Sequence, residues 1–235
     1  MRKLIVVSGG TKGIGRAVIE CFADKGFDVV SCSRNQEDLQ QLKEDIEGQF
    51  AGVQVYIHKA DLSVKEEVLG FVGFINNLNR SVDVLVNNTG VFIPGQIHQE
   101  EDGVLEQMIN TNLYSAYYLT RGLVKKMKEN RSGHIFTICS TASITAYVNG
   151  GSYGISKFAL LGMNKVLREE MKEFGIKVTS VLPGATLTAS WEGVDFPPER
   201  FMKPEDVAEA ILGAYNMSPR SVMEEVLIRP MEGDI

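Results

Sequence analysis

The chain has 235 residues, of which 44% are hydrophobic and 23% are charged, and its formal net charge is −6. This length predicts a single domain over residues 1–235 that buries a large core without needing a metal or a disulfide. The acidic balance argues against the basic face that a nucleic-acid-binding surface requires, and no apolar run approaches the length of a membrane span.

The short apolar opening is too brief for a signal peptide, and the three cysteines and three histidines are scattered without metal-ligand spacing. We therefore expect no metal site, no membrane contact, and three reduced thiols of the kind found in a cytoplasmic protein. Cys139 is more simply explained by packing in a strand than as a redox-sensitive thiol.

The opening stretch predicts a strand, a glycine-rich turn and the start of a helix. The run from Leu4 to Val7 is continuously apolar, which is typical of a strand buried on both faces of a parallel sheet. The turn Ser8–Gly15 lets backbone N–H groups approach a pyrophosphate at the positive end of the helix. Its spacing, Gly-x-x-x-Gly-x-Gly, differs from the common dinucleotide fingerprint, so the turn alone could equally be structural.

The rest of the chain alternates between strand and helix patterns. Strands are predicted at 27–33, 53–57, 82–86, 134–139, 177–182 and 225–229, and helices at 16–23, 37–50, 64–78, 100–128, 153–174 and 204–215. Such alternation gives right-handed crossovers, so we predict an α/β fold with a doubly wound, mostly parallel sheet of the Rossmann type. The irregular segment at about 188–203 is predicted to cap the site.

Polar segments follow the strands of this predicted sheet. In a doubly wound sheet the ligand lies beyond the carboxyl ends of the strands, at the switch point beside the first strand. The segments in that position are Ser8–Gly15, Ser33–Arg34, Asp61–Leu62, Asn87–Gly90, Ser140 and Pro183–Thr188. We therefore expect one ligand site that is built from several of these loops.

Tyr153 and Lys157 are four positions apart at the start of a predicted helix, so they share one face. A phenol has a pKa near ~10, and a nearby ammonium favours the phenolate and lowers that pKa. Ser140 lies at the carboxyl end of a strand and can hydrogen-bond a substrate carbonyl oxygen. An isolated Tyr–Lys pair at this spacing would more simply be an incidental surface pair.

Taken in order, these motifs resemble the short-chain dehydrogenase/reductase family over about residues 1–188. The shared features are the glycine turn, the Asn87–Gly90 segment, Ser140 thirteen residues before Tyr153, the Tyr-x-x-x-Lys spacing and Pro183-Gly184. The resemblance implies an NAD(P)-dependent oxidoreductase that moves a hydride between nicotinamide and a carbonyl or alcohol substrate. It makes Tyr153 the general acid–base, lets Ser140 polarise the carbonyl, and lets Lys157 bind the nicotinamide ribose and lower the tyrosine pKa.

The family's fourth catalytic residue, an asparagine, maps to Asn112 rather than Asn110 and would hold a water that links Lys157 to solvent. By the same resemblance, Asp61 and Leu62 would flank the adenine, Asn87 and Gly90 would line the cofactor, and Thr188 would approach the carboxamide. The full set expected to bind the cofactor is Ser8, Gly9, Thr11, Lys12, Gly13, Ile14, Gly15, Ser33, Arg34, Asp61, Leu62, Asn87, Thr89, Gly90, Tyr153, Lys157, Pro183, Gly184, Thr186 and Thr188.

Two features depart from the family pattern. Thr89 stands where the family usually has alanine, which places a hydroxyl and an extra branch on the cofactor wall. The family's frequent glycine-rich end after the last strand is missing, which bears on the subunit contacts that such a tail makes.

The end of the second predicted strand favours NADP(H) over NAD(H). An NAD enzyme of this fold usually has an acidic residue there, whereas this chain has Ser33, with Arg34 beside it and Lys12 in the glycine turn. Two cations without a carboxylate suit a 2′-phosphate, which arginine can bind with two hydrogen bonds. The alternative is that Arg34 is only a solvated turn residue.

The cap and the segments that face it predict a mostly apolar pocket for a small uncharged ketone, aldehyde, diketone or alcohol. The expected walls contain Trp191, Val194, Phe196, Phe201, Val91, Phe92, Ile93, Ile144, Tyr147 and Val148. Helices that are apolar on more than one face predict a homodimer or homotetramer. Two other functions stay open: a non-catalytic NADP-binding sensor or scaffold, and an epimerase or dehydratase on the same fold.

Overall fold

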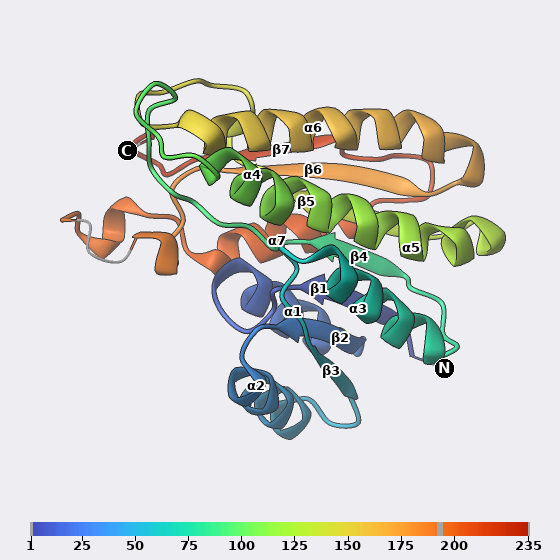
Figure 1. The fold of residues 1–235 in the computed structure, drawn as a ribbon. Helices are drawn as coiled ribbons and strands as arrows, with labels where there is room; N and C mark the ends of the chain where they lie inside the picture. The colour runs from blue at the N-terminus through green and yellow to red at the C-terminus, as the bar shows by residue number, and fades with distance from the viewer. Residues whose placement is uncertain (1, 192–194, 235) are drawn as a thin grey trace.

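The computed structural model describes residues 2–191 and 195–234 (Figure 1). Within them the centre is a seven-stranded sheet in the order β3-β2-β1-β4-β5-β6-β7, and every neighbouring pair is parallel. The strands are β1 (Leu4–Ser8), β2 (Asp28–Ser33), β3 (Val55–Lys59), β4 (Val84–Asn87), β5 (His134–Ile138), β6 (Lys177–Pro183) and β7 (Glu225–Ile228). The prediction of a doubly wound sheet of the Rossmann type is confirmed.

Helices cover both faces of the sheet. They are α1 (Gly13–Asp24), α2 (Gln36–Gln49), α3 (Lys65–Asn77), α4 (Val104–Met108), α5 (Ser115–Asn130), α6 (Gly151–Met171) and α7 (Pro204–Tyr215). Figure 1 shows α1, α2 and α7 on one face and α3 to α6 on the other. None of the helices in the described ranges is long and apolar enough to cross a membrane.

Alternate residues of the inner strands point into opposite layers of the core. Ile5 and Val7 pack with α1 and α7, whereas Leu4 and Val6 pack with α3 and α5. All five residues of β1 are buried, so the predicted strand with two covered faces is confirmed. This burial fixes β1 at the centre of the sheet and places the glycine-rich turn at the switch point beside β4.

The helix predicted over 100–128 is wrong in two respects. Residues before Val104 form turns that end at Gly103, whose φ of +94° favours glycine, so α4 begins only after it. Between α4 and α5 the chain forms a π-helical segment, η1 (Ile109–Tyr114). The apolar periodicity hides this segment, because π and α turns expose nearly the same side of so short a stretch.

An ion pair closes the amino-terminal edge of the sheet. Arg80 Nη1 lies 2.7 Å from Asp28 Oδ2, and the two side chains are only 10% and 7% exposed. Arg80 Nη2 also donates to the carbonyl of Arg2 at 2.7 Å, and Asp28 Oδ1 accepts from the backbone N–H of Gln54 at 2.9 Å. The pair thereby ties β2 to the segments that enter β1, β3 and β4.

We expect His134 to make the protein less stable in acid. Its ring is buried and stacked on Phe136, with Nε2 2.7 Å from Thr179 Oγ1. Burial, with a smaller effect of Lys177, lowers the pKa of His134 from 6.5 to about 3. Between pH 6.5 and 3, His134 is therefore protonated in the unfolded chain but neutral in the folded chain. The free energy of unfolding should fall over this interval as the pH is lowered, by up to about 1.4 kcal/mol per pH unit.

Urea unfolding at pH 7 and at pH 4.5 measures this loss of stability. His134→Leu removes the titrating group, so the variant should lose less free energy over the same pH interval than the wild type. An equal pH dependence in both proteins would show that other groups cause the acid sensitivity.

Candidate active site

The structure brings the predicted polar segments to the carboxyl edge of the sheet. The Ser8 hydroxyl, at the end of β1, accepts hydrogen bonds from the backbone N–H groups of Asn88 and Thr89, after β4, at 2.9 and 3.0 Å. Thr188, after β6, lies over the glycine turn, since a Cβ built on Gly13 would be 3.1 Å from its Cγ2. The loops that follow β1, β4 and β6 therefore meet, as the sequence predicts.

The glycine-rich turn is tightly enclosed. A side chain at Gly15 would bring its Cβ within 2.4 Å of the carbonyl of Gly9, and Gly9 itself has a φ of +68°. The helix α1 that follows has no side-chain cap at its N-cap residue, Lys12, and no acidic residue in its first turn. Its first N–H groups are thus available to an anion such as a pyrophosphate.

Asn88 lies in the predicted Asn87–Gly90 segment, but its own role could not be read from the sequence. Its side-chain Nδ2 donates to the carbonyls of Ser8 and Gly9, at 2.9 Å each, and so holds the glycine turn against the end of β4. The neighbouring Asn87, which we expect to line the cofactor, donates through its Nδ2 to Thr120 Oγ1 on α5 at 2.9 Å. The sequence signal for Asn88 is its position directly after the buried strand β4.

Two buried polar atoms on this wall have no partner within the described chain. They are Asn87 Oδ1 and Thr89 Oγ1. The Thr89 hydroxyl lies against the turn, 3.1 Å from the position of a Cβ on Gly9, so the residue that replaces the family's alanine is accommodated there. Because buried polar atoms are nearly always hydrogen-bonded, these two atoms and the free N–H groups of α1 fit a polar ligand such as a dinucleotide.

Helix α6 carries Tyr153 and Lys157 on one face. The Lys157 side chain is buried, and its Nζ donates to the carbonyl of Ile138, at the end of β5, at 2.9 Å. The same Nζ lies 5.8 Å from the centre of the Tyr153 ring. Burial lowers the pKa of Lys157 from 10.5 to about 8. The structure therefore places the ammonium at the end of β5 and near the Tyr153 ring.

The phenol itself does not have the lowered pKa that we expected. Burial raises the pKa of Tyr153, and a hydrogen bond from the Ser140 hydroxyl only partly opposes this rise. The Ser140 oxygen accepts from the backbone N–H of Ala142 at 3.1 Å, so its own hydrogen is available to Tyr153 or to a carbonyl oxygen. The expected lowering of the Tyr153 pKa is not found, because the Lys157 ammonium is hydrogen-bonded to the Ile138 carbonyl and burial of the phenol has the larger effect on its pKa.

Asn112 lies in the π-helical segment η1 and is fully buried, whereas Asn110 is exposed. Its Oδ1 accepts from Val91 N at 2.7 Å, and its Nδ2 donates to Val91 O at 3.0 Å and to Ser156 Oγ at 2.9 Å. A Cβ built on Gly90 would lie within 3.5 Å of both Asn112 and Lys157. The structure thus brings Asn112 to Lys157.

The two predicted cations have acidic neighbours. Lys12 Nζ lies 3.3 Å from Asp38 Oδ2 in the first turn of α2, so the expectation that no carboxylate accompanies them is wrong. Arg34 is exposed. Burial opposes a lower pKa of Asp61, but the hydrogen bonds from Ser63 and the charge of Arg34 together lower this pKa. The residues at the end of β2 do not include Asp38, which the first turn of α2 brings back toward the glycine turn.

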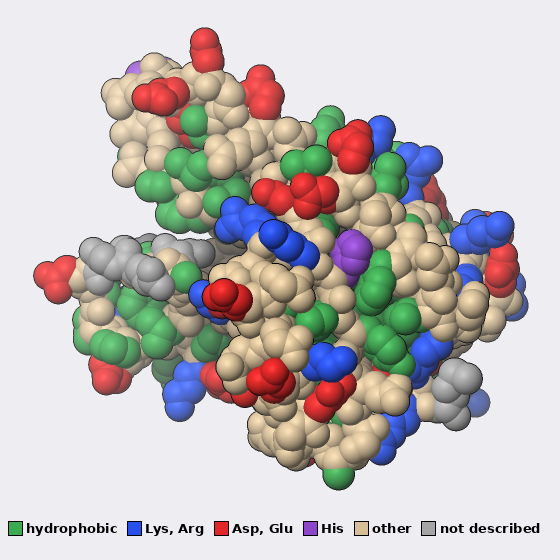
Figure 2. Space-filling model, turned by 60° about the horizontal axis from the view of Figure 1, so that its bottom comes forward, with side chains coloured by type: hydrophobic (Ala, Val, Ile, Leu, Met, Phe, Trp, Pro, Cys, Tyr) green, Lys and Arg blue, Asp and Glu red, His purple; other side chains and the backbone are tan. Residues whose placement is uncertain are grey.

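The expected substrate walls are only partly exposed. Phe201 is buried against Trp191, with ring centres 5.1 Å apart, so it belongs to the base of the cap. Phe92 makes an edge contact with the Tyr153 ring at 4.9 Å. Gly193 and Val194 lie outside the described residues. Figure 2 shows a recess beside the cap, with hydrophobic side chains on the side opposite the cap. Exposed apolar residues of these segments are Ile144, Tyr147, Val148, Leu187 and Phe196.

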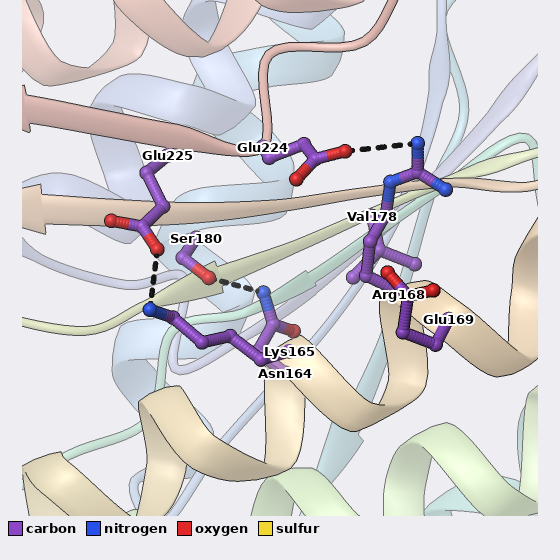
Figure 3. A pocket seen from close by; sticks show the side chains of 8 residues that line it. All are labelled: Asn164, Lys165, Arg168, Glu169, Val178, Ser180, Glu224 and Glu225. Atoms are coloured by element: carbon purple, nitrogen blue, oxygen red, sulfur yellow. Dashed lines mark hydrogen bonds and ion pairs between the residues drawn. The ribbon is translucent and has the colours of Figure 1, made fainter.

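A separate hollow of about 240 Å³ lies between α6, β6 and β7 (Figure 3). Four of its charged residues form two ion pairs, Lys165 with Glu225 at 2.9 Å and Arg168 with Glu224 at 3.1 Å. None of the predicted catalytic residues lines it. Across residues 2–191 and 195–234, no group of three His, Cys, Asp or Glu side chains is arranged to hold a metal ion.

The parallel sheet, the glycine turn at its switch point and the Ser–Tyr–Lys group beside that turn define a nucleotide-binding protein of the Rossmann type. The model of the short chain dehydrogenase family matches residues 3–195. The chain therefore belongs to the short-chain dehydrogenase/reductase family of oxidoreductases.

Individual relatives agree with this assignment. The chain is 32% identical to the sepiapterin reductase of Chlorobaculum tepidum, over 100% of this chain and 99% of that protein. Among solved structures, a metagenomic short-chain oxidoreductase in complex with NADP has 28% identity and a TM-score of 0.84, with 97% of each chain covered. L-sorbose reductase from Gluconobacter frateurii, complexed with NADPH and L-sorbose, has 25% identity and a TM-score of 0.90, covering 97% of this chain and 95% of that one.

Proposed function

We propose that this oxidoreductase is an NADP(H)-dependent carbonyl reductase or alcohol dehydrogenase, with Tyr153 as its general acid–base. The observation that supports this most directly is the meeting of Ser140, Tyr153 and Lys157 at the carboxyl edge of the sheet, beside the glycine turn. The relatives crystallised with NADP or NADPH support the choice of cofactor.

A nicotinamide cofactor would supply the hydride when bound. The start of α1 would bind its pyrophosphate, because the N–H groups there lack a cap, and Lys157 would bind the nicotinamide ribose. Adenine contacts of Asp61 and Leu62 and a carboxamide contact of Thr188 complete the arrangement that the family resemblance implies. The protein's part is placement, since the hydride chemistry belongs to the cofactor.

Tyr153 would donate a proton to the carbonyl oxygen while Ser140 hydrogen-bonds the same oxygen. The raised pKa of Tyr153 keeps the phenol protonated at neutral pH, which suits the direction of reduction. In the direction of alcohol oxidation the phenol must first lose that proton, so the rate of oxidation should rise with pH. Lys157 and Asn112 would then return the proton to solvent through the water that the resemblance implies.

One experiment separates this proposal from its alternatives. NADPH absorbance is followed with a panel of uncharged ketones, aldehydes and diketones, with sepiapterin included because a relative bears its name. Oxidation of NADPH with any of them supports the reductase. NADP(H) binding without turnover would favour a sensor or scaffold, and substrate conversion without net NADPH consumption would favour an epimerase or dehydratase.

The pocket is proposed to take small uncharged carbonyls rather than thioesters or acids, because the exposed cap and loop residues are mainly apolar.

We also propose a homodimer or homotetramer. Tyr114, Tyr117, Ile155 and Phe158 expose large apolar side chains on η1, α5 and α6, which a second copy would cover. Light scattering at micromolar concentration tests this, and a monomer would contradict it.

Arg34→Ala should reduce the preference for NADPH over NADH by roughly 10- to 150-fold, because a charge-assisted contact to the 2′-phosphate is worth roughly 1.5–3 kcal/mol. Lys12→Ala should reduce this preference less, since Lys12 already forms an ion pair with Asp38. The measurement is the ratio of kcat/KM for the two cofactors.

Arg220→Ala is the matched control. This arginine is also exposed but precedes β7, so it lies toward the amino-terminal edge of the sheet. Its removal should leave the cofactor ratio unchanged. If the ratio is also unchanged in Arg34→Ala, Arg34 does not bind the 2′-phosphate and is only a solvated turn residue.

A further inference from the structure

Helix α6, which carries Tyr153 and Lys157, has no capping side chain of its own. Its N-cap residue is Gly150, and no side chain there binds the first N–H groups of the helix. Unpaired N–H groups at a helix start need partners, and a buried start without them is costly. A partner comes from a different part of the chain.

The carboxylate of Glu100, in the loop between β4 and α4, supplies that cap. Glu100 Oε1 accepts from the backbone N–H of Ser152 at 2.9 Å, and Oε2 accepts a short hydrogen bond from the Ser152 hydroxyl. A carboxylate at this end also interacts favourably with the helix dipole. Both oxygens of Glu100 are thus committed to the residue directly before Tyr153.

The surrounding backbone is fitted to this carboxylate. A Cβ built on Gly151 would lie 2.0 Å from Glu100 Oε1, and one on Gly95 would lie 2.7 Å from Glu100 Cγ. The backbone N–H of Gly95 donates to Asn149 O at 3.0 Å, so the loop after β4 is joined to the loop before α6. Both glycines therefore leave the space that the Glu100 side chain occupies.

The same loop also reaches the phenol from its other side. Phe92, eight positions before Glu100 in the chain, makes the edge contact with the Tyr153 ring. One segment thus holds the ring of Tyr153 through Phe92 and the backbone before Tyr153 through Glu100. A loop held only by Phe92 would leave the start of α6 free to fray.

We propose that Glu100 is a positioning residue, whose carboxylate fixes the start of α6 and thereby the direction of the Tyr153 hydroxyl toward Ser140. The catalytic part of this inference rests on the proposed reductase function. Its structural part, the control of Tyr153 by Glu100, does not.

The test compares Glu100→Ala, Glu100→Gln and the matched control Glu101→Ala, an exposed acid next in the chain. The first readout needs no turnover. Tyrosine is labelled with ¹³C, the Tyr153 signal is assigned by its loss in Tyr153→Phe, and hydrogen exchange is measured for the amides of 151–157. In Glu100→Ala the Tyr153 signal should shift and these amides should exchange at least about tenfold faster, with both unchanged in Glu101→Ala.

The second readout is the split between kcat and KM. In Glu100→Ala, kcat should fall about tenfold or more while KM for NADPH changes less than twofold, because a small misplacement of a catalytic group reduces turnover without removing binding. Glu100→Gln keeps the size of the side chain and one acceptor oxygen, so its kcat should lie between those of the wild type and Glu100→Ala. This variant also provides the test if Glu100→Ala fails to fold.

An unchanged Tyr153 signal and unchanged exchange in both Glu100 variants would overturn the proposal, whatever the activity of the protein. A wild-type protein that consumes no NADPH with the carbonyl panel would refute the proposed function alone, and the spectroscopic readout would still judge Glu100. A kcat within twofold of wild type in a folded Glu100→Ala variant would also count against the positioning role.

Discussion

Tyr153→Phe should remove most of the turnover while leaving NADPH binding close to that of the wild type. The substitution keeps the ring, and with it the edge contact to Phe92, and removes only the hydroxyl that donates the proton. General acid–base catalysis is typically worth roughly 10²–10⁴-fold in rate, so kcat should fall by about that factor. Steady-state kinetics and NADPH fluorescence titration measure the two quantities separately.

Tyr117→Phe is the control for the loss of a phenol, because Tyr117 is half-exposed on the outer surface of α5. It should leave both quantities unchanged. Lys157→Ala should damage binding and turnover together, since we expect the lysine to hold the ribose as well. If Tyr153→Phe keeps more than about a tenth of the wild-type rate on a reactive substrate, Tyr153 is not the general acid, given the usual size of that effect.

Arg80→Ala should destabilise the fold by about 3–5 kcal/mol, because it leaves the Asp28 carboxylate buried without its partner. It also removes the hydrogen bond that Arg80 donates to the carbonyl of Arg2. Urea unfolding at pH 7 measures the loss. Turnover per folded molecule should not change, since the pair lies at the amino-terminal edge of the sheet, away from Tyr153.

The exposed pair between Arg229 and Asp234 provides the comparison, with a separation of 2.9 Å and side chains that are 38% and 46% exposed. Exposed pairs usually contribute about 0–1 kcal/mol, so Arg229→Ala should cost no more than that. The double variant Arg80→Leu with Asp28→Asn should recover part of the stability lost in Arg80→Ala, because no uncompensated charge stays buried. Equal losses at the buried and exposed pairs would contradict the argument.

The parts of the fold that the sequence predicts are those that depend on neighbouring residues. The apolar run of β1, the glycine turn and the start of α1 follow one another directly, and alternation of strands and helices then determines a parallel sheet. Tyr153 and Lys157 could be found for the same reason, since helical spacing alone places them on one face.

The features that the sequence did not predict depend on residues far apart in the chain. Asn88 binds the turn after β1, Asp38 returns to Lys12 from α2, and Glu100 caps a helix that begins 51 positions later. The direction in which the pKa of Tyr153 shifts likewise depends on burial of its ring by several segments of the chain, which outweighs the opposing hydrogen bond from Ser140. Spacing patterns contain no information on such contacts.

The π-helical segment η1 also sets a limit on how this chain can vary in length. A π turn holds one more residue than an α turn, so deleting a single residue within 109–114 would allow α4 and α5 to join as one regular helix. Because the wider π turn accommodates the extra residue, the faces of α4 and α5 on either side would keep their orientation, and the residues inside the turn would change theirs. Asn112 lies inside that turn, so it would lose its hydrogen bonds to Val91 and Ser156, and with them its place beside Lys157.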